Sequence, residues 1–196
     1  MNAPAQDVRE VLLTHEQIAA RVRDLGAAIS RDYVDRVPLL VSVLKGAVYF
    51  LTDLSRAIEV QTEIDFMAIT TYGTARAKSG VVRLIKDLDV EITGRDVLLV
   101  EDVIDTGLTA GYLVRLLQAR SPATLRICTL LDRPYRRILD TLEIGYRGFE
   151  IPDRFVVGYG LDYRERYRHL PFIGVLNDEV LAAAGGTRPQ PVPDTT

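Results

Sequence analysis

A chain of 196 residues suits one domain with a single substantial core, and its net charge of −3 argues against a protein that coats nucleic acid, which needs a basic excess. The single cysteine, Cys128, excludes an internal disulfide framework, and no apolar run approaches the ~20 residues of a membrane helix. We therefore expect a cytoplasmic protein with neither nucleic acid nor a membrane as its partner.

Helix and strand patterns alternate along the chain. Thr14 and Gln17 fit a capping box, and apolar residues follow at helical spacing, which predicts an amphipathic helix over residues 15–34. The remaining expected elements are a doubly buried strand at 38–44, a helix at 47–58, strands at 61–72, 81–85 and 97–100, a helix at 107–119, and strands at 125–131, 155–159 and 172–176. The last three strands are expected to complete a set of central strands. This alternation predicts an α/β domain with a mostly parallel sheet covered by helices.

The two ends of the chain differ from its middle. Residues 1–9 are expected to form an N-terminal tail, and residues 10–182 a single domain. Residues 183–196 are rich in Pro and Gly and poor in apolar residues, which is typical of a disordered tail.

The most informative segment joins the strand at 97–100 to the helix at 107–119. Three carboxylates follow the apolar run, namely Glu101, Asp102 and Asp105. In open α/β sheets, ligands bind beyond the carboxyl ends of the strands, which is where this segment lies. The acidic pair Glu101-Asp102 suits ribose hydroxyls and magnesium, either directly or through water.

The start of the following helix favours a phosphate. A helix N-terminus offers free N–H groups and the positive end of the helix dipole, and small residues such as Gly107 allow close approach. Thr106 and Thr109 add hydroxyl donors. The pattern of a Walker loop is absent. The alternative is that the acids only cap the helix.

This segment resembles the phosphoribosyl pyrophosphate motif of the type I phosphoribosyltransferases, and within them the hypoxanthine-guanine enzymes. The resemblance extends over about residues 10–178 and implies that family's fold, with a mostly parallel central sheet flanked by helices, a small hood subdomain formed largely by residues 151–178, and a mobile lid loop. The residues implied to bind phosphoribosyl pyrophosphate are Glu101, Asp102, Asp105, Thr106, Gly107, Leu108 and Thr109, with Leu108 at a position where some members carry lysine.

Two further segments match the family earlier in the chain. Lys45-Gly46 is similar to its pyrophosphate loop, in which the Leu44-Lys45 peptide can be cis and expose backbone N–H groups; by itself the segment reads equally as a surface turn. Thr71-Tyr72 opens a polar loop over residues 72–82 and resembles the family's lid, which covers the reacting centre. The alternative for that loop is a plain hairpin tip.

The segment most specific to this branch begins at residue 151 and resembles the family's purine pocket. By resemblance, Phe155 stacks on the base and the backbones of Val156 and Asp162 address the purine edge. The Asp162 carboxylate is placed for a second Mg²⁺, and Arg168 for pyrophosphate. Taken without its neighbours, Phe155 reads as a core residue.

One position departs from the family. A lysine commonly stands where this chain has Arg133, and its ammonium donates to the 6-oxo group of the purine. Arginine is still a cationic donor but is bulkier and planar. Discrimination against adenine should survive, whereas the preference among hypoxanthine, guanine and xanthine is left open.

The resemblance implies an enzyme of purine salvage that transfers the 5-phosphoribosyl group from phosphoribosyl pyrophosphate to hypoxanthine or guanine, giving IMP or GMP and pyrophosphate. It further implies Mg²⁺ bound by Glu101, Asp102 and Asp162, Asp105 as general base, and a homodimer or homotetramer. Two alternatives stand beside it, namely a xanthine-preferring enzyme and a regulator that kept the fold to sense nucleotides and bind nucleic acid.

Overall fold

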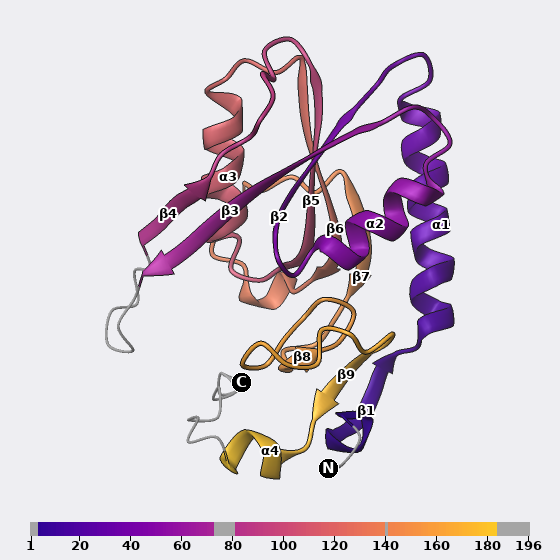
Figure 1. Ribbon diagram of the computed structural model, residues 1–196, viewed down its shortest axis with the longest axis vertical. Coiled ribbons are helices and arrows are strands. Elements are labelled where there is room, and N and C mark those ends of the chain that lie inside the picture. The colour runs from indigo at the N-terminus through magenta and orange to yellow at the C-terminus, as the bar shows by residue number, and fades with distance from the viewer. Residues whose placement is uncertain (1–3, 73–80, 140, 184–196) are drawn as a thin grey trace.

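The computed structural model describes residues 4–72, 81–139 and 141–183. They form a central six-stranded sheet and, beside it, a smaller three-stranded sheet (Figure 1). In chain order the elements are η1 Pro4–Asp7, β1 Val8–Leu13, α1 His15–Asp32, β2 Leu39–Leu44, α2 Val48–Ala57, β3 Glu63–Tyr72, β4 Val81–Lys86, β5 Asp96–Ile104, α3 Leu108–Gln118, β6 Thr124–Asp132, η2 Pro134–Arg136, β7 Tyr146–Glu150, β8 Val156–Val157, β9 Ile173–Leu176 and α4 Asp178–Ala183.

The central sheet has the strand order β4-β3-β2-β5-β6-β7, and only the pairing of β3 with β4 is antiparallel. Its two faces bury separate sets of side chains. Leu40 and Leu98 pack with α1 and α2 on one face, and Leu39 and Val97 pack with α3 on the other. The expected α/β domain with a mostly parallel sheet covered by helices is confirmed.

The first helix begins where the sequence predicts. Thr14 Oγ1 accepts from the Gln17 backbone N–H at 3.3 Å, and Gln17 Oε1 accepts from the Thr14 N–H at 2.8 Å, which completes the capping box. The buried side of α1 follows the expected helical spacing and includes Ile18, Val22 and Ile29. The helix ends at Asp32, two residues earlier than expected.

The expectation that residues 155–159 and 172–176 complete the central sheet is wrong. They contain β8 and β9, which form a separate antiparallel sheet with β1 in the order β1-β9-β8. An apolar run shows that a strand is buried but does not identify its partners. This small sheet lies largely within residues 151–178, the segment implied to form a hood, and also includes β1. From here on, the hood means β1, β8, β9 and the segment 158–172 that joins β8 to β9.

Two strands were missing from the sequence analysis. In β1 only Leu13 is buried, and β7 carries a glycine and mostly half-exposed or exposed residues, so neither has a strong apolar pattern. Because β1 begins at Val8 and η1 at Pro4, structure starts earlier than the expected domain boundary at residue 10. Residues 184–196 of the expected C-terminal tail lie outside the described residues.

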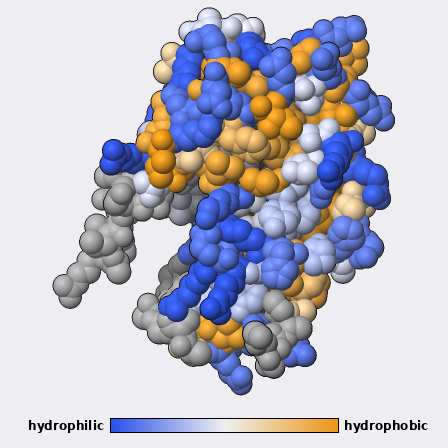
Figure 2. All heavy atoms as spheres, in the orientation of Figure 1, coloured by the Kyte–Doolittle hydropathy of each residue, from blue (hydrophilic) through white to orange (hydrophobic). Residues whose placement is uncertain are grey.

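β5 is longer than expected and runs to Ile104, so Glu101 and Asp102 belong to the strand rather than to the loop after it. The hood adjoins this end of the sheet (Figure 1). In the space-filling view, hydrophilic residues gather at the level where the two sheets adjoin, and hydrophobic ones show mainly over the larger sheet (Figure 2). No helix in the described parts of the chain is both long and apolar enough to cross a membrane.

Candidate active site

The loop after β2 lies directly against the end of β5. A Cβ added to Gly46 would fall 1.8 Å from Asp102 Oδ2, so a larger residue at this position would require the carboxylate to move. The peptide bond between Leu44 and Lys45 is cis. The structure therefore brings together two of the motifs that the sequence singled out, the Lys45-Gly46 loop and the acidic pair.

The hood covers the same place from the other side. Gly160, at φ +99°, lies so close that a Cβ there would fall 2.0 Å from the Gly46 carbonyl oxygen. Arg168 Nη1 donates to the Gly160 carbonyl at 2.8 Å, and Arg168 Nη2 pairs with Asp162 Oδ1 at 2.8 Å. Asp162 and Arg168 thus lie at the same place as Gly46 and Asp102.

The two acids of β5 are buried. Burial raises the pKa of Asp102 to about 6, while backbone donors and Arg168 act in the opposite direction. Burial also raises the pKa of Glu101 well above its usual value, and the neighbouring Asp102 adds to that shift. A divalent cation beside them would favour their ionised forms, because an opposite charge offsets the desolvation of a carboxylate.

Within residues 4–72, 81–139 and 141–183, no group of three or more His, Cys, Asp or Glu side chains has the arrangement of a metal centre. Asp162 forms an ion pair with Arg168. Magnesium, however, usually binds through one or two carboxylates and takes its other ligands from water and substrate phosphates. The carboxylates of Glu101 and Asp102 fit that kind of site.

A cavity of about 270 Å³ opens between the end of β5 and the start of α3. Its walls are Glu101, Asp102, Val103, Ile104, Asp105, Thr106, Gly107, Thr109 and Ala110. Gly107 precedes α3 with φ +80°, a left-handed conformation that glycine adopts without strain, and no side chain caps the helix from that position. An anion in this cavity would meet the free N–H groups of a helix N-terminus.

Asp105 is held on one side only. Arg136 Nη1 donates to Asp105 Oδ2 at 3.1 Å, and Arg133 Nη1 lies 3.8 Å from the same oxygen. The other oxygen, Oδ1, is buried and accepts no hydrogen bond from the described residues. This geometry leaves Asp105 with one fixed oxygen and one that can accept a proton from a ligand.

Arg136 is a residue that the sequence analysis missed. Its Nε also lies 3.4 Å from Asp153 Oδ1, so it ties Asp105 to the segment that leads into the hood. The only signal in the sequence is a pair of arginines after Pro134, which has no distinctive spacing.

Arg133 is buried beside Asp105 at the wall of the site. It donates a hydrogen bond to the Arg154 carbonyl, and burial lowers the pKa of its guanidinium. Phe155, next in the chain, is half-buried and packs edge-on against Tyr163 with ring centroids 5.7 Å apart. Val156 follows as a buried residue of β8. Arg133 therefore lies beside Asp105, and its hydrogen bond to Arg154 links it to the segment that carries Phe155 and Val156. Contact of these three residues with a purine stays a prediction.

The predicted lid is described only in part. Thr71 and Tyr72 are the last residues of β3, and the loop that they open, residues 73–80, lies outside the described residues.

Comparison with known proteins gives one consistent family. Residues 9–164 match the family model of the phosphoribosyl transferase domain. The chain is 54% identical over 180 residues to the hypoxanthine-guanine phosphoribosyltransferase of Mycobacterium bovis, with 89% of each chain covered. It is 49% identical over 174 residues to that of Bacillus subtilis, covering 89% of this chain and 96% of the relative. The crystal structure of a hypoxanthine phosphoribosyltransferase from Staphylococcus aureus superposes with a TM-score of 0.87 at 46% identity, over 92% of this chain and 98% of that one.

Proposed function

The chain belongs to the phosphoribosyltransferase family, in its hypoxanthine-guanine branch, and we propose that it salvages purines by transferring the 5-phosphoribosyl group of phosphoribosyl pyrophosphate to hypoxanthine or guanine. The products are IMP or GMP and pyrophosphate. The observation that carries the proposal is the convergence of three segments: Gly160 lies against Gly46, Gly46 lies against Asp102, and Asp102 lines the cavity at the start of α3.

The substrate is proposed to bind along these segments. The 5-phosphate takes the cavity at the helix N-terminus, where Thr106 and Thr109 add hydroxyls. Glu101 and Asp102 bind the ribose hydroxyls. Pyrophosphate is proposed to bind Lys45 and the backbone of Gly46 on one side and Arg168 on the other.

Mg²⁺ is proposed as the cofactor, held by Glu101 and Asp102 with a further ion at Asp162. When bound, it would neutralise part of the negative charge of the pyrophosphate. Lys45 and Arg168 stabilise the charge that builds up as the bond between C1 and pyrophosphate breaks and the bonding electrons leave with pyrophosphate.

Asp105 is the proposed general base. Its Oδ1 accepts the proton at purine N7, so that N9 can form the new bond to C1. Arg136 holds Oδ2 and thereby fixes the direction of Oδ1. Thr71 and Tyr72, as part of a lid, exclude water that could otherwise attack the ribose.

Arg133, Phe155, Val156 and Asp162 are proposed to recognise the base. A guanidinium at Arg133 donates to a 6-oxo group and has no acceptor to meet in the 6-amino group of adenine. We also propose a cytoplasmic enzyme that assembles as a homodimer or homotetramer.

The proposal is tested with purified protein, Mg²⁺ and phosphoribosyl pyrophosphate against hypoxanthine, guanine, xanthine and adenine. Turnover of hypoxanthine and guanine with scarcely any of adenine is expected. A preference for xanthine would identify the protein as a xanthine-preferring phosphoribosyltransferase. Ligand binding without turnover would indicate a regulator.

A further inference from the structure

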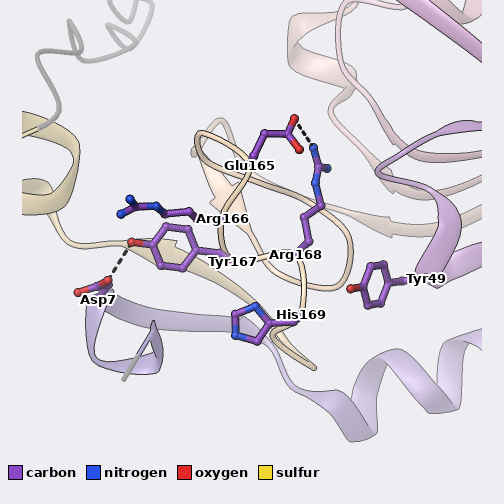
Figure 3. Close-up of a pocket in the computed structure, with 7 residues that line it drawn as sticks. All are labelled: Asp7, Tyr49, Glu165, Arg166, Tyr167, Arg168 and His169. Atoms are coloured by element: carbon purple, nitrogen blue, oxygen red, sulfur yellow. Dashed lines mark hydrogen bonds and ion pairs between the residues drawn. The ribbon is translucent and has the colours of Figure 1, made fainter. Parts of the chain in front are cut away.

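Glu165 bridges the two cations to which the proposed function assigns pyrophosphate. Its Oε2 lies 3.0 Å from Lys45 Nζ, and its Oε1 lies 3.2 Å from Arg168 Nη2. Figure 3 shows the carboxylate and the guanidinium meeting at the edge of a cavity of about 510 Å³ that Tyr49 and His169 also line. One carboxylate thus holds both cations, one with each oxygen.

The local backbone presents Glu165 at this place. Tyr163 and Arg166 exchange two backbone hydrogen bonds of 3.1 Å, which makes a tight turn with Arg164 and Glu165 at its tip. These two residues have φ of 54° and 62°, a left-handed conformation that is unfavourable for side chains other than glycine, Asn and Asp. The Glu165 N–H also donates to Asp162 Oδ2 at 2.9 Å. The hydrogen bonds of the turn therefore hold Glu165 in a backbone conformation that this residue type seldom adopts.

The contacts of Glu165 can be exchanged, but Arg168 is fixed. The side chains of Lys45 and Glu165 are 69% and 65% exposed, so water screens their attraction. Arg168 is only 19% exposed and keeps its bonds to Asp162 and to the Gly160 carbonyl when Glu165 moves away. A ligand can displace the carboxylate without dismantling the site.

We propose that Glu165 is an internal competitor at the pyrophosphate subsite, which occupies Lys45 and Arg168 in the free enzyme and returns to them when pyrophosphate leaves. This inference rests on the proposed function, because that function places pyrophosphate between these cations. Pyrophosphate carries more negative charge and more acceptor oxygens than one carboxylate, so it displaces Glu165. The competition weakens binding of the substrate's pyrophosphate group and speeds release of the product.

The test measures binding of inorganic pyrophosphate at a fixed Mg²⁺ concentration by isothermal titration calorimetry. Glu165→Gln removes the charge and keeps the size, and Glu165→Asn adds a residue that accepts a positive φ. Because Glu165 and Lys45 are exposed and water screens their charges, we expect both variants to bind pyrophosphate roughly twofold to tenfold more tightly than the parent protein. Glu179→Gln, which removes an exposed carboxylate on α4, should leave the dissociation constant unchanged.

The same measurement in a protein that also carries Lys45→Gln separates competition from a general charge effect. In Lys45→Gln protein, Glu165 has one cation less to occupy, so the gain from Glu165→Gln should shrink. Equal or weaker pyrophosphate binding by both Glu165 variants, with phosphoribosyl transfer intact in the parent, overturns this inference alone. A parent protein that neither binds pyrophosphate nor transfers the phosphoribosyl group overturns the proposed function and the subsite together.

Discussion

Gly160 of the hood lies against Gly46 of the loop after β2, so that a Cβ on Gly160 would fall 2.0 Å from the Gly46 carbonyl oxygen. Gly46 in turn lies against the Asp102 carboxylate of β5. Three segments far apart in the sequence are therefore stacked, with backbone against backbone between Gly160 and Gly46 and backbone against a carboxylate between Gly46 and Asp102. The stack is close because both positions are glycine. The distance between the hood and the acids of β5 therefore also depends on these two glycines.

Replacing Gly160 should separate this stack. Gly160→Ala adds a methyl group against backbone at a residue with φ +99°, so we expect a loss of ~1–3 kcal/mol in unfolding free energy and a higher KM for phosphoribosyl pyrophosphate. Urea denaturation and steady-state kinetics measure the two effects. Gly94→Ala is the matched control, because Gly94 also has positive φ, at +70°, but open space around its Cβ position. Equal kinetic effects of the two substitutions would contradict the steric explanation.

Asp105→Asn should abolish proton acceptance at N7 and preserve the shape of the side chain. General-base contributions are typically ~10²–10⁴-fold, and kcat should fall within that range with little change in phosphoribosyl pyrophosphate binding. Asp153→Asn removes the other carboxylate that Arg136 contacts and should reduce kcat far less. An Asp105→Asn protein with more than half of the parent activity would exclude the assigned role.

Arg133 tests the departure from the family pattern. Arg133→Lys should keep activity and shift the ratio of hypoxanthine to guanine turnover, since an ammonium replaces a planar guanidinium. Arg133→Ala should raise the KM for both bases and also leave the Arg154 carbonyl without its donor. Base KM values that stay at the parent level in Arg133→Ala would place this residue outside the purine pocket.

Cys128 should be inert in the folded protein. Its side chain is fully buried, and burial raises the pKa of the thiol, which suppresses the reactive thiolate. We expect a thiol reagent such as 5,5′-dithiobis(2-nitrobenzoic acid) to titrate no thiol in native protein and one after unfolding in guanidinium. Fast reaction of the native protein would mean that β6 opens readily.

The elements with a strong local pattern could be predicted from the sequence. The helix at Thr14 carries its own capping signal, and the strand at 97–100 is nearly all apolar, so both were found. β1 was missed because it buries little more than Leu13, and its partner β9 lies about 160 residues away, beyond the reach of any local pattern.

The candidate site was predictable where residue type and order carry the chemistry, as in Glu101 to Thr109. Contacts made by common residue types across long separations were not. The pair of Glu165 with Lys45 spans 120 residues, and Arg136 reaches Asp105 across 31. Nothing in the spacing of these charged residues distinguishes them from the many others on the surface, and only the fold brings them together.

The hood is assembled from both ends of the domain: β1 pairs with β9, and the Asn177 N–H donates to the Asp7 carbonyl at 2.8 Å. A ribosome therefore delivers the proposed phosphate-binding segment between β5 and α3 well before the last strand of the hood. We expect a nascent chain stalled ahead of Ile173 to form the central sheet while β1 is still unpaired, because its partner β9 has not been synthesised. Base recognition, which we propose for the hood, is thus expected to be the last property that the protein acquires during its synthesis, and limited proteolysis of stalled chains would reveal that order.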